Sequence, residues 1–150
     1  MLRPVKLPLV LGILMCAPFA VAQTNLGELL DAGAKKMSPQ EFEEQLVQRM
    51  VVGPTATGGS LEVMYAASGV VVGVGRAPRF TMAARISGEW KFDDSSRVCS
   101  SMRMGSSDLT FTGVVLPPRC QFWFKLNDKY FLSDSDSDRS AKVLSRTLKQ

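Results

Sequence analysis

The sequence contains no histidine among its 150 residues, which removes the side chain most used as a general base and as a metal ligand. Nucleophilic triads that depend on histidine are therefore excluded. No stretch reaches the ~18–20 uninterrupted apolar residues of a membrane-spanning helix. What remains is an ordinary globular composition, 45% hydrophobic and 21% charged. We expect no cofactor, no metal site and no catalytic residue that the sequence alone identifies.

Residues 1–22 have the three parts of a secretory signal peptide. Arg3 and Lys6 form a positive start, an apolar run follows, and residues 20–22 supply the small residues that signal peptidase accepts. We expect cleavage before Gln23 and a periplasmic or secreted protein without stable membrane insertion. Both basic residues leave with the segment, so the formal net charge falls from +4 to +2. The alternative is a membrane-anchored form in which Cys16 carries a lipid.

Cleavage would leave two cysteines, Cys99 and Cys120. An even pair in an exported chain predicts one disulfide, which would close a loop of about 22 residues. A zinc site lacks histidine ligands, and the spacing differs from the Cys-x-x-Cys of redox pairs. Strand alternation places Cys120 inward, with Phe122, and Cys99 outward. A β-bulge or a pairing near a sheet edge would reconcile the two.

Residues 23–60 predict a helical segment followed by a connector. Leucines at helical spacing within residues 26–30 precede Gly33, a helix stop. Residues 38–41 then read Ser-Pro-Gln-Glu, the pattern of a capping box with proline at the first helical position. This second helix is expected to carry one apolar stripe and to end at residues 53–54. The stripe consists of Phe42, Leu46 and Met50.

Residues 61–150 predict a β-rich domain, because apolar and polar residues alternate there with a period of two. Short strands separated by turns are typical of antiparallel hairpins. The expected fold is α+β and mostly β: an N-terminal helical segment packed on an antiparallel β-meander, as a small sandwich or barrel with one disulfide. Strands are expected near residues 80–86, 90–92, 98–104, 109–116, 120–126, 129–132 and 141–148, with a turn at residues 117–118.

Three features occur in order along the chain: the segment LLDAGAKKMSPQEF, the unit Gly88-Glu89-Trp90, and the cysteine pair around a hairpin region. In these the chain resembles the small exported proteobacterial proteins grouped as domain-of-unknown-function family 995. The resemblance would cover roughly residues 26–148. It implies a periplasmic location and a small β-fold, and it implies no known chemistry.

One strand position suggests a partner-binding site. Trp123 lies between Gln121 and Lys125, so alternation places its ring on the outward face, where exposed tryptophans anchor interfaces. Arg85 and Arg103 also occupy outward positions and would extend a basic surface toward an acidic partner. Two alternatives stay open: a helix of the same chain covers Trp123, or the basic residues are simply dispersed and solvated.

Other motifs have simpler interpretations. Asp134, Asp136 and Asp138 alternate as calcium ligands do, but the central glycine and distal glutamate of such a loop are missing, which favours a polar turn. Residues 69–75 read GVVVGVG without the lysine and helix of a phosphate-binding loop, which favours a glycine-punctuated strand.

The function expected from these observations is that of an exported, non-enzymatic periplasmic protein that binds a protein or a cell-envelope component. No aromatic-basic pattern of a nucleic-acid module is present, so nucleic acid is not an expected partner. The alternative is a carboxylate-dependent periplasmic hydrolase. Its only sequence support is tandem acidic pairs such as Asp93-Asp94, which carry little weight without a placed partner.

Overall fold

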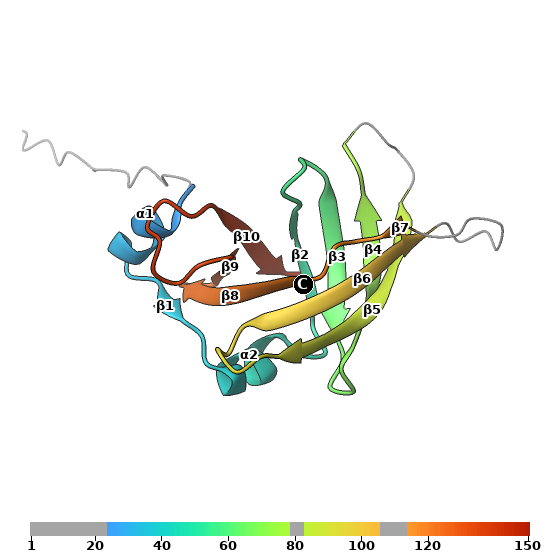
Figure 1. The fold of residues 1–150 in the computed structure, drawn as a ribbon, viewed down its shortest axis with the longest axis horizontal. Coiled ribbons are helices and arrows are strands. Elements are labelled where there is room, and N and C mark those ends of the chain that lie inside the picture. Colours follow the sequence, from blue (N-terminus) through green and yellow to red (C-terminus); the bar gives the residue numbers. More distant parts are fainter. Residues whose placement is uncertain (1–23, 79–82, 106–113) are drawn as a thin grey trace, which may run out of the picture.

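The computed structural model of the chain describes residues 24–78, 83–105 and 114–150. These ranges form a mostly β protein in which eight antiparallel strands close into a barrel (Figure 1). The expected antiparallel, mostly β fold is thereby confirmed, and of the two architectures it is the barrel. The expected signal segment, residues 80–82 of one expected strand and residues 109–113 of another lie outside the described residues.

The barrel strands follow the chain as a meander, and each pairs with its neighbours in the order β8-β9-β10-β2-β3-β4-β5-β6. The ring closes where β6 pairs back with β8. The strands are β2 (Met50–Pro54), β3 (Ser60–Tyr65), β4 (Val70–Arg76), β5 (Ala84–Phe92), β6 (Val98–Gly105), β8 (Arg119–Leu126), β9 (Lys129–Ser133) and β10 (Val143–Leu148).

Two short strands extend the seam between β6 and β8. β1 (Lys35–Lys36) pairs with the end of β8, and β7 (Val114–Val115) pairs with the end of β6. β7 and β8 both run antiparallel to β6, so the turn expected at residues 117–118 is wrong. The two prolines lack the backbone N–H that a sheet ladder needs, so they interrupt what would otherwise be one continuous strand. As a result, the pairing of β8 with β6 is shifted by one residue relative to the pairing of β7 with β6.

The helices are short, so the α+β description overstates them. α1 (Leu26–Asp31) has six residues and α2 (Pro39–Leu46) has eight. The segment 23–60 is not helical throughout, because it also contains β1, β2 and the start of β3. Met50 was expected on the helical stripe but begins β2, where it pairs with Met64. The helix ends earlier because Val47 is already extended and Gln48 has a positive φ of 62°.

α2 closes one end of the barrel, and it begins at a complete capping box. The Glu41 backbone N–H donates to the Ser38 hydroxyl, and the Ser38 backbone N–H donates to the Glu41 carboxylate, at 3.2 and 2.8 Å. The hydrogen bond from the Ser38 backbone N–H to the carboxylate is the main cause that lowers the pKa of Glu41. The buried side chains of Phe42 and Leu46 then enter the barrel interior. We call this end of the barrel the plugged end.

α1 lies outside the barrel, over β8, β9 and β10 (Figure 1). Leu26 and Leu29 of α1 are fully buried and belong to one cluster with Phe122, Phe124 and Phe131 from the outer face of the wall. β8 and β9 are therefore buried on both faces, one toward the barrel interior and one toward α1. No helix among the described residues is long and apolar enough to cross a membrane.

The barrel strands coil tightly, and a glycine permits this on β5. At Gly88 an added Cβ would collide with the carbonyl oxygen of Ser101 on β6, so no larger residue fits without a shift of the backbone. Glycine inside a strand often marks such a close approach. Closing a ring of only eight strands requires strong coiling, and an eight-stranded barrel encloses space for side chains or one small ligand.

Candidate ligand-binding site

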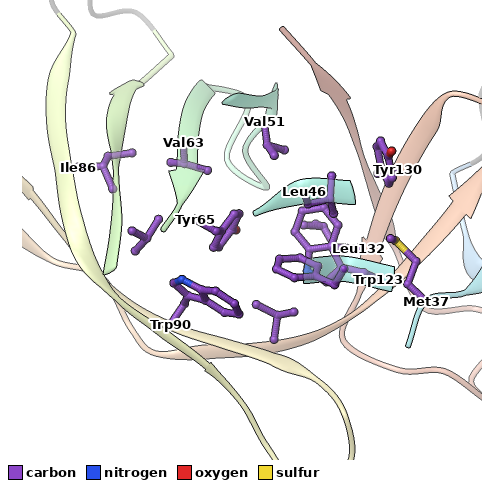
Figure 2. Packing of buried hydrophobic residues seen from close by; sticks show 13 residues of the cluster. Met37, Leu46, Val51, Val63, Tyr65, Ile86, Trp90, Trp123, Tyr130 and Leu132 are labelled. Carbon is purple, nitrogen blue, oxygen red and sulfur yellow. The ribbon is translucent and has the colours of Figure 1, made fainter. Parts of the chain in front are cut away.

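The barrel interior is divided into a packed part and a cavity. At the plugged end, Phe42 meets Trp90 at 5.5 Å and Trp123 at 5.2 Å between ring centroids. Tyr65 belongs to the same aromatic group, 5.7 Å from Trp90 (Figure 2). The rings come from α2 and from three different strands, and they meet in the tilted and edge-on arrangements that aromatic pairs prefer. Of these rings, Tyr65 also lines a cavity toward the other end of the barrel.

A cavity of about 300 Å³ lies toward that other end, which we call the open end. This volume is at the lower limit of small-molecule sites in proteins. Its wall combines interior positions of β3, β6, β8, β9 and β10 with the loop between β2 and β3 and the segment between β7 and β8. The apolar side chains of the wall are Leu61, Val63, Met102, Met104, Leu116, Leu132 and Leu144. Such a lining favours an apolar occupant.

Arg146 is the one side chain of the cavity wall, among the described residues, that is both charged and buried. It comes from β10, is only 5% exposed, and its Nη1 donates to the carbonyl oxygens of Pro54 and Ser145 at 2.7 and 2.8 Å. Burial lowers the pKa of its guanidinium, although the group stays charged at physiological pH. In the described part of the chain no carboxylate pairs with Arg146.

Gly53 makes room for this arginine. Gly53 faces the barrel interior on β2, opposite Leu61, and an added Cβ would lie 2.8 Å from Nη1 and 2.9 Å from Cδ of Arg146. The arginine side chain therefore lies directly across the glycine backbone, and this lets Nη1 reach the Pro54 carbonyl. A side chain at residue 53 would collide with the backbone carbonyl oxygen of Ser145 as well as with the Arg146 side chain.

The Nε–H and Nη2–H groups of Arg146 make no hydrogen bond within the described residues. No side-chain nitrogen or oxygen there is both fully buried and without a partner. These free donors must therefore reach space that water can enter, and the space that Arg146 lines is the cavity. The structure thus presents N–H donors of a cation to a mostly apolar cavity.

Tyr65 supplies a second polar group to the same cavity. Its side chain is 5% exposed and lines the cavity from β3, and its hydroxyl has no hydrogen-bond partner in the described part of the chain. Burial raises the pKa of Tyr65 to about 12, although the charge of Arg146 acts in the opposite direction. The hydroxyl is therefore a neutral donor at physiological pH.

The mouth of the cavity is also polar. Arg119 is exposed there, and Gln121 donates from Nε2 to the Asp134 carboxylate at 2.8 Å. The described residues that line the cavity include two arginines and no aspartate or glutamate. The local charge is therefore positive, although the whole chain is only weakly basic.

The four residues expected to bind a partner do not form one surface. Trp123 was expected outside, but it is 4% exposed and lies inside the barrel, paired across the ladder with Leu132. Lys125 is half-buried at the plugged end, where its Nζ donates to Gln45 at 2.8 Å. Arg85 and Arg103 are exposed on the outer face of β5 and β6. The expectation of an exposed anchor at Trp123 is therefore wrong.

The error arises because α1 forms a second layer over the outer face of β8. Phe122 and Phe124 were expected to face the core, and they do face a buried cluster, but that cluster lies outside the barrel beneath α1. Both faces of β8 are apolar and covered, so alternation alone cannot identify which face is the interior. The alternative that a helix covers Trp123 is close to the finding, since Phe42 of α2 contacts its ring.

The expected disulfide is confirmed. Cys99 of β6 and Cys120 of β8 are directly opposite each other, with an S–S distance of 2.04 Å and a Cα–Cα distance of 3.9 Å. Directly paired residues point to the same face of a sheet, and here that face is the outer one. The apparent conflict between the two cysteines disappears, because Cys120 shares the outer face with Phe122 rather than the interior.

The three aspartates that follow β9 make separate contacts. Asp134 accepts from Gln121, Asp136 pairs with Lys36 at 2.8 Å, and Asp138 accepts from Ser140. The contact with Lys36 lowers the pKa of Asp136. This matches a polar turn rather than a calcium loop. Among the described residues, the one group with metal-ligand spacing is Asp93 with the two cysteines, whose sulfurs are committed to the disulfide.

Sequence reasoning missed Arg146 and Tyr65, although one signal was available. Arg146 shares its strand parity with Leu144 and Leu148, so it occupies an apolar-facing position of the last strand. A charged residue on the apolar parity of a strand indicates a special interior contact. Tyr65 gave no such signal, because tyrosine is common on any strand face.

Comparisons of the chain with protein-family models, with curated proteins and with solved structures found no match. The resemblance to domain-of-unknown-function family 995 therefore stays a prediction.

Proposed function

We propose that this chain is an exported, non-enzymatic binding protein that holds a small apolar molecule inside its barrel. The observation that carries the proposal is the cavity at the open end, with leucine, valine and methionine side chains around about 300 Å³. Burying the apolar surface of a ligand against such a lining contributes roughly 25 cal/mol for each Å² removed from water. The occupant would be one component of the cell envelope or its surroundings.

Export is part of the same proposal. Its support is the signal-like sequence of residues 1–22. The disulfide between Cys99 and Cys120 also fits an oxidising compartment such as the periplasm. No observation favours the alternative of a carboxylate-dependent hydrolase: the described lining of the cavity offers no acidic side chain.

The proposal is tested with a neutral apolar probe, N-phenyl-1-naphthylamine, whose fluorescence rises when it leaves water. We expect saturable binding at one site per chain. Leu144→Trp would place a large side chain at the cavity wall and should weaken binding at least about tenfold, equivalent to ~1.4 kcal/mol.

Val72→Trp on the outer face of β4 is the matched control and should leave binding unchanged. Circular dichroism establishes that both variants are folded. Absence of saturable binding to the native protein, or equal binding by a folded Leu144→Trp variant, would contradict the proposal.

A further inference from the structure

The buried guanidinium of Arg146 indicates the chemical class of the occupant more specifically than the cavity volume does. Arg146 is 5% exposed, lies among apolar side chains, and has no carboxylate partner in the described ranges. Buried charges in proteins are normally paired, because an isolated charge loses its hydration without compensation. Two backbone carbonyls satisfy Nη1 only. The charge itself therefore has no counter-ion from the described part of the protein.

We propose that a carboxylate group of the occupant supplies this counter-ion, so that the barrel binds a small apolar molecule with one carboxylate, such as a medium-chain fatty acid. This inference rests on the proposed function and names its ligand class. The carboxylate accepts hydrogen bonds from Nε and Nη2 of Arg146 and from the hydroxyl of Tyr65. The apolar part of the ligand lies against the leucine and methionine wall.

The geometry of the free donors favours a carboxylate over other head groups. Nε–H and the adjacent Nη2–H of a guanidinium form a fork that matches the two oxygens of a carboxylate. The remaining polar group of the site, Tyr65, is a neutral donor whose hydroxyl opens on the same cavity. One cation and one neutral donor balance a single negative charge, whereas an amine would meet repulsion and an alcohol would leave the cation unpaired.

The position of Arg146 is built into the fold rather than left to an exposed loop. Gly53 provides the space for its stem, and the Pro54 carbonyl holds Nη1 at 2.7 Å. The fork is therefore fixed before a ligand arrives, which limits the entropy lost on binding. Arg103 on the outer face of β6 differs in this respect, because it is exposed to solvent and does not line the cavity. Arg103 therefore serves as the control.

The first experiment compares three ligands of equal chain length on the native protein: decanoate, decanol and decylamine. Isothermal titration calorimetry at neutral pH should show decanoate binding about 10- to 100-fold more tightly than decanol, the range expected for hydrogen bonds to a charged group. Decylamine should bind most weakly. Equal binding of decanoate and decanol, or tighter binding of decylamine, would overturn the inference while leaving the proposed function intact. If none of the three binds, and the neutral fluorescent probe does not bind either, the proposed function itself fails.

The second experiment uses two arginine variants of the full chain. Arg146→Met should abolish the preference for decanoate over decanol, whereas Arg103→Met, on the outer face of β6, should keep it within about twofold. Tyr65→Phe should weaken decanoate several-fold and leave decanol unchanged, because only the hydroxyl is removed. A folded Arg146→Met variant that still prefers decanoate would overturn the inference.

The third experiment needs no variant, so it decides the matter even if Arg146→Met fails to fold. Decanoate labelled with ¹³C at the carboxyl carbon is titrated by NMR when bound to the native protein. Pairing with a buried cation favours the ionised form, so the pKa of the bound carboxyl should lie below that of free decanoate. An apolar site without such pairing would raise that pKa. A raised value would therefore overturn the inference.

Discussion

Phe42 of α2 packs against Trp123 of β8 with ring centroids 5.2 Å apart and ring planes at 72°. This contact joins the helix that plugs the barrel to the wall that carries the disulfide. It also connects two parts of the sequence that lie far apart along the chain. Around this contact lie further aromatic rings of the interior, among them Trp90 and Tyr65 (Figure 2).

We expect Trp123→Ala to lower the free energy of unfolding by ~3–5 kcal/mol, because it removes a buried aromatic side chain from a packed interior. Urea unfolding followed by circular dichroism measures the change. Val115→Ala, at a residue that is 60% exposed, is the control and should change stability by less than ~0.5 kcal/mol. A Trp123→Ala variant as stable as the native protein would show that the ring is not part of the core.

We expect replacement of both Cys99 and Cys120 by alanine to lower stability by about 3 kcal/mol, since the bond links positions 21 residues apart and restricts the unfolded chain. The measurement is urea unfolding with and without a reducing agent. The reducing agent should destabilise the native protein by the same amount and leave the double variant unaffected. Free thiols at these two positions in unreduced protein, detected by alkylation and mass spectrometry, would contradict the pairing.

We expect Ser38→Ala to lower stability by about 1 kcal/mol, because it removes the hydroxyl that caps the first turn of α2. Glu43→Ala, at an exposed position of the same helix, is the control and should have little effect. Thermal unfolding measures both variants. Equal changes in the two would indicate that general helix propensity, rather than the cap, explains the result.

We expect the stability of the native protein to fall more steeply above pH 10 than that of Tyr65→Phe. Burial raises the pKa of Tyr65 to about 12 in the folded protein, whereas the unfolded chain has the ordinary value near 10. Between these values the folded state retains a proton that the unfolded state has lost, so stability decreases by about 1.4 kcal/mol for each pH unit. Urea unfolding at pH 9, 10 and 11 tests this. Parallel pH profiles for the two proteins would contradict it.

We expect exported material to begin at Gln23, because residues 20–22 match the small-residue pattern of a signal peptidase site. N-terminal sequencing of protein recovered from the periplasm measures this directly. A lipid-modified Cys16 at the start of the chain would instead indicate a membrane-anchored form, and a retained Met1 would indicate that the segment is not processed.

Local patterns in the sequence predicted much of the barrel wall. Alternation located β5, β6, β8, β9 and β10, and the even cysteine count predicted the disulfide. Alternation could not decide which face of β8 is the interior, because α1 covers the outer face of a strand that is apolar on both sides. It also missed the continuation of β7 into β8, because paired prolines usually mark a turn rather than an interrupted strand.

The candidate site was harder to predict than the fold, because its residues come from separate strands. Arg146 and Tyr65 meet only after β10 and β3 take their places in the ring, and the Pro54 carbonyl that holds Arg146 belongs to the end of β2. Backbone carbonyls carry no residue-specific signal in a sequence. Gly53 faces the interior of β2 without a side chain, but the sequence could not indicate this role. Residues 53–54 are Gly-Pro, which predicts the end of a helix instead.

The pairing of β10 with β2 has a consequence for how the protein forms. Thr147 and Leu148, near one end of the domain, pair with Val52 and Val51, near the other. During synthesis, β2 has hydrogen-bonding groups exposed along this edge until β10 emerges. Ring closure is therefore a late event with a high entropic cost, and the barrel should fold slowly for its size. Before closure the growing chain has an exposed strand edge. Such edges make a folding intermediate prone to aggregation, and chaperones can shield them.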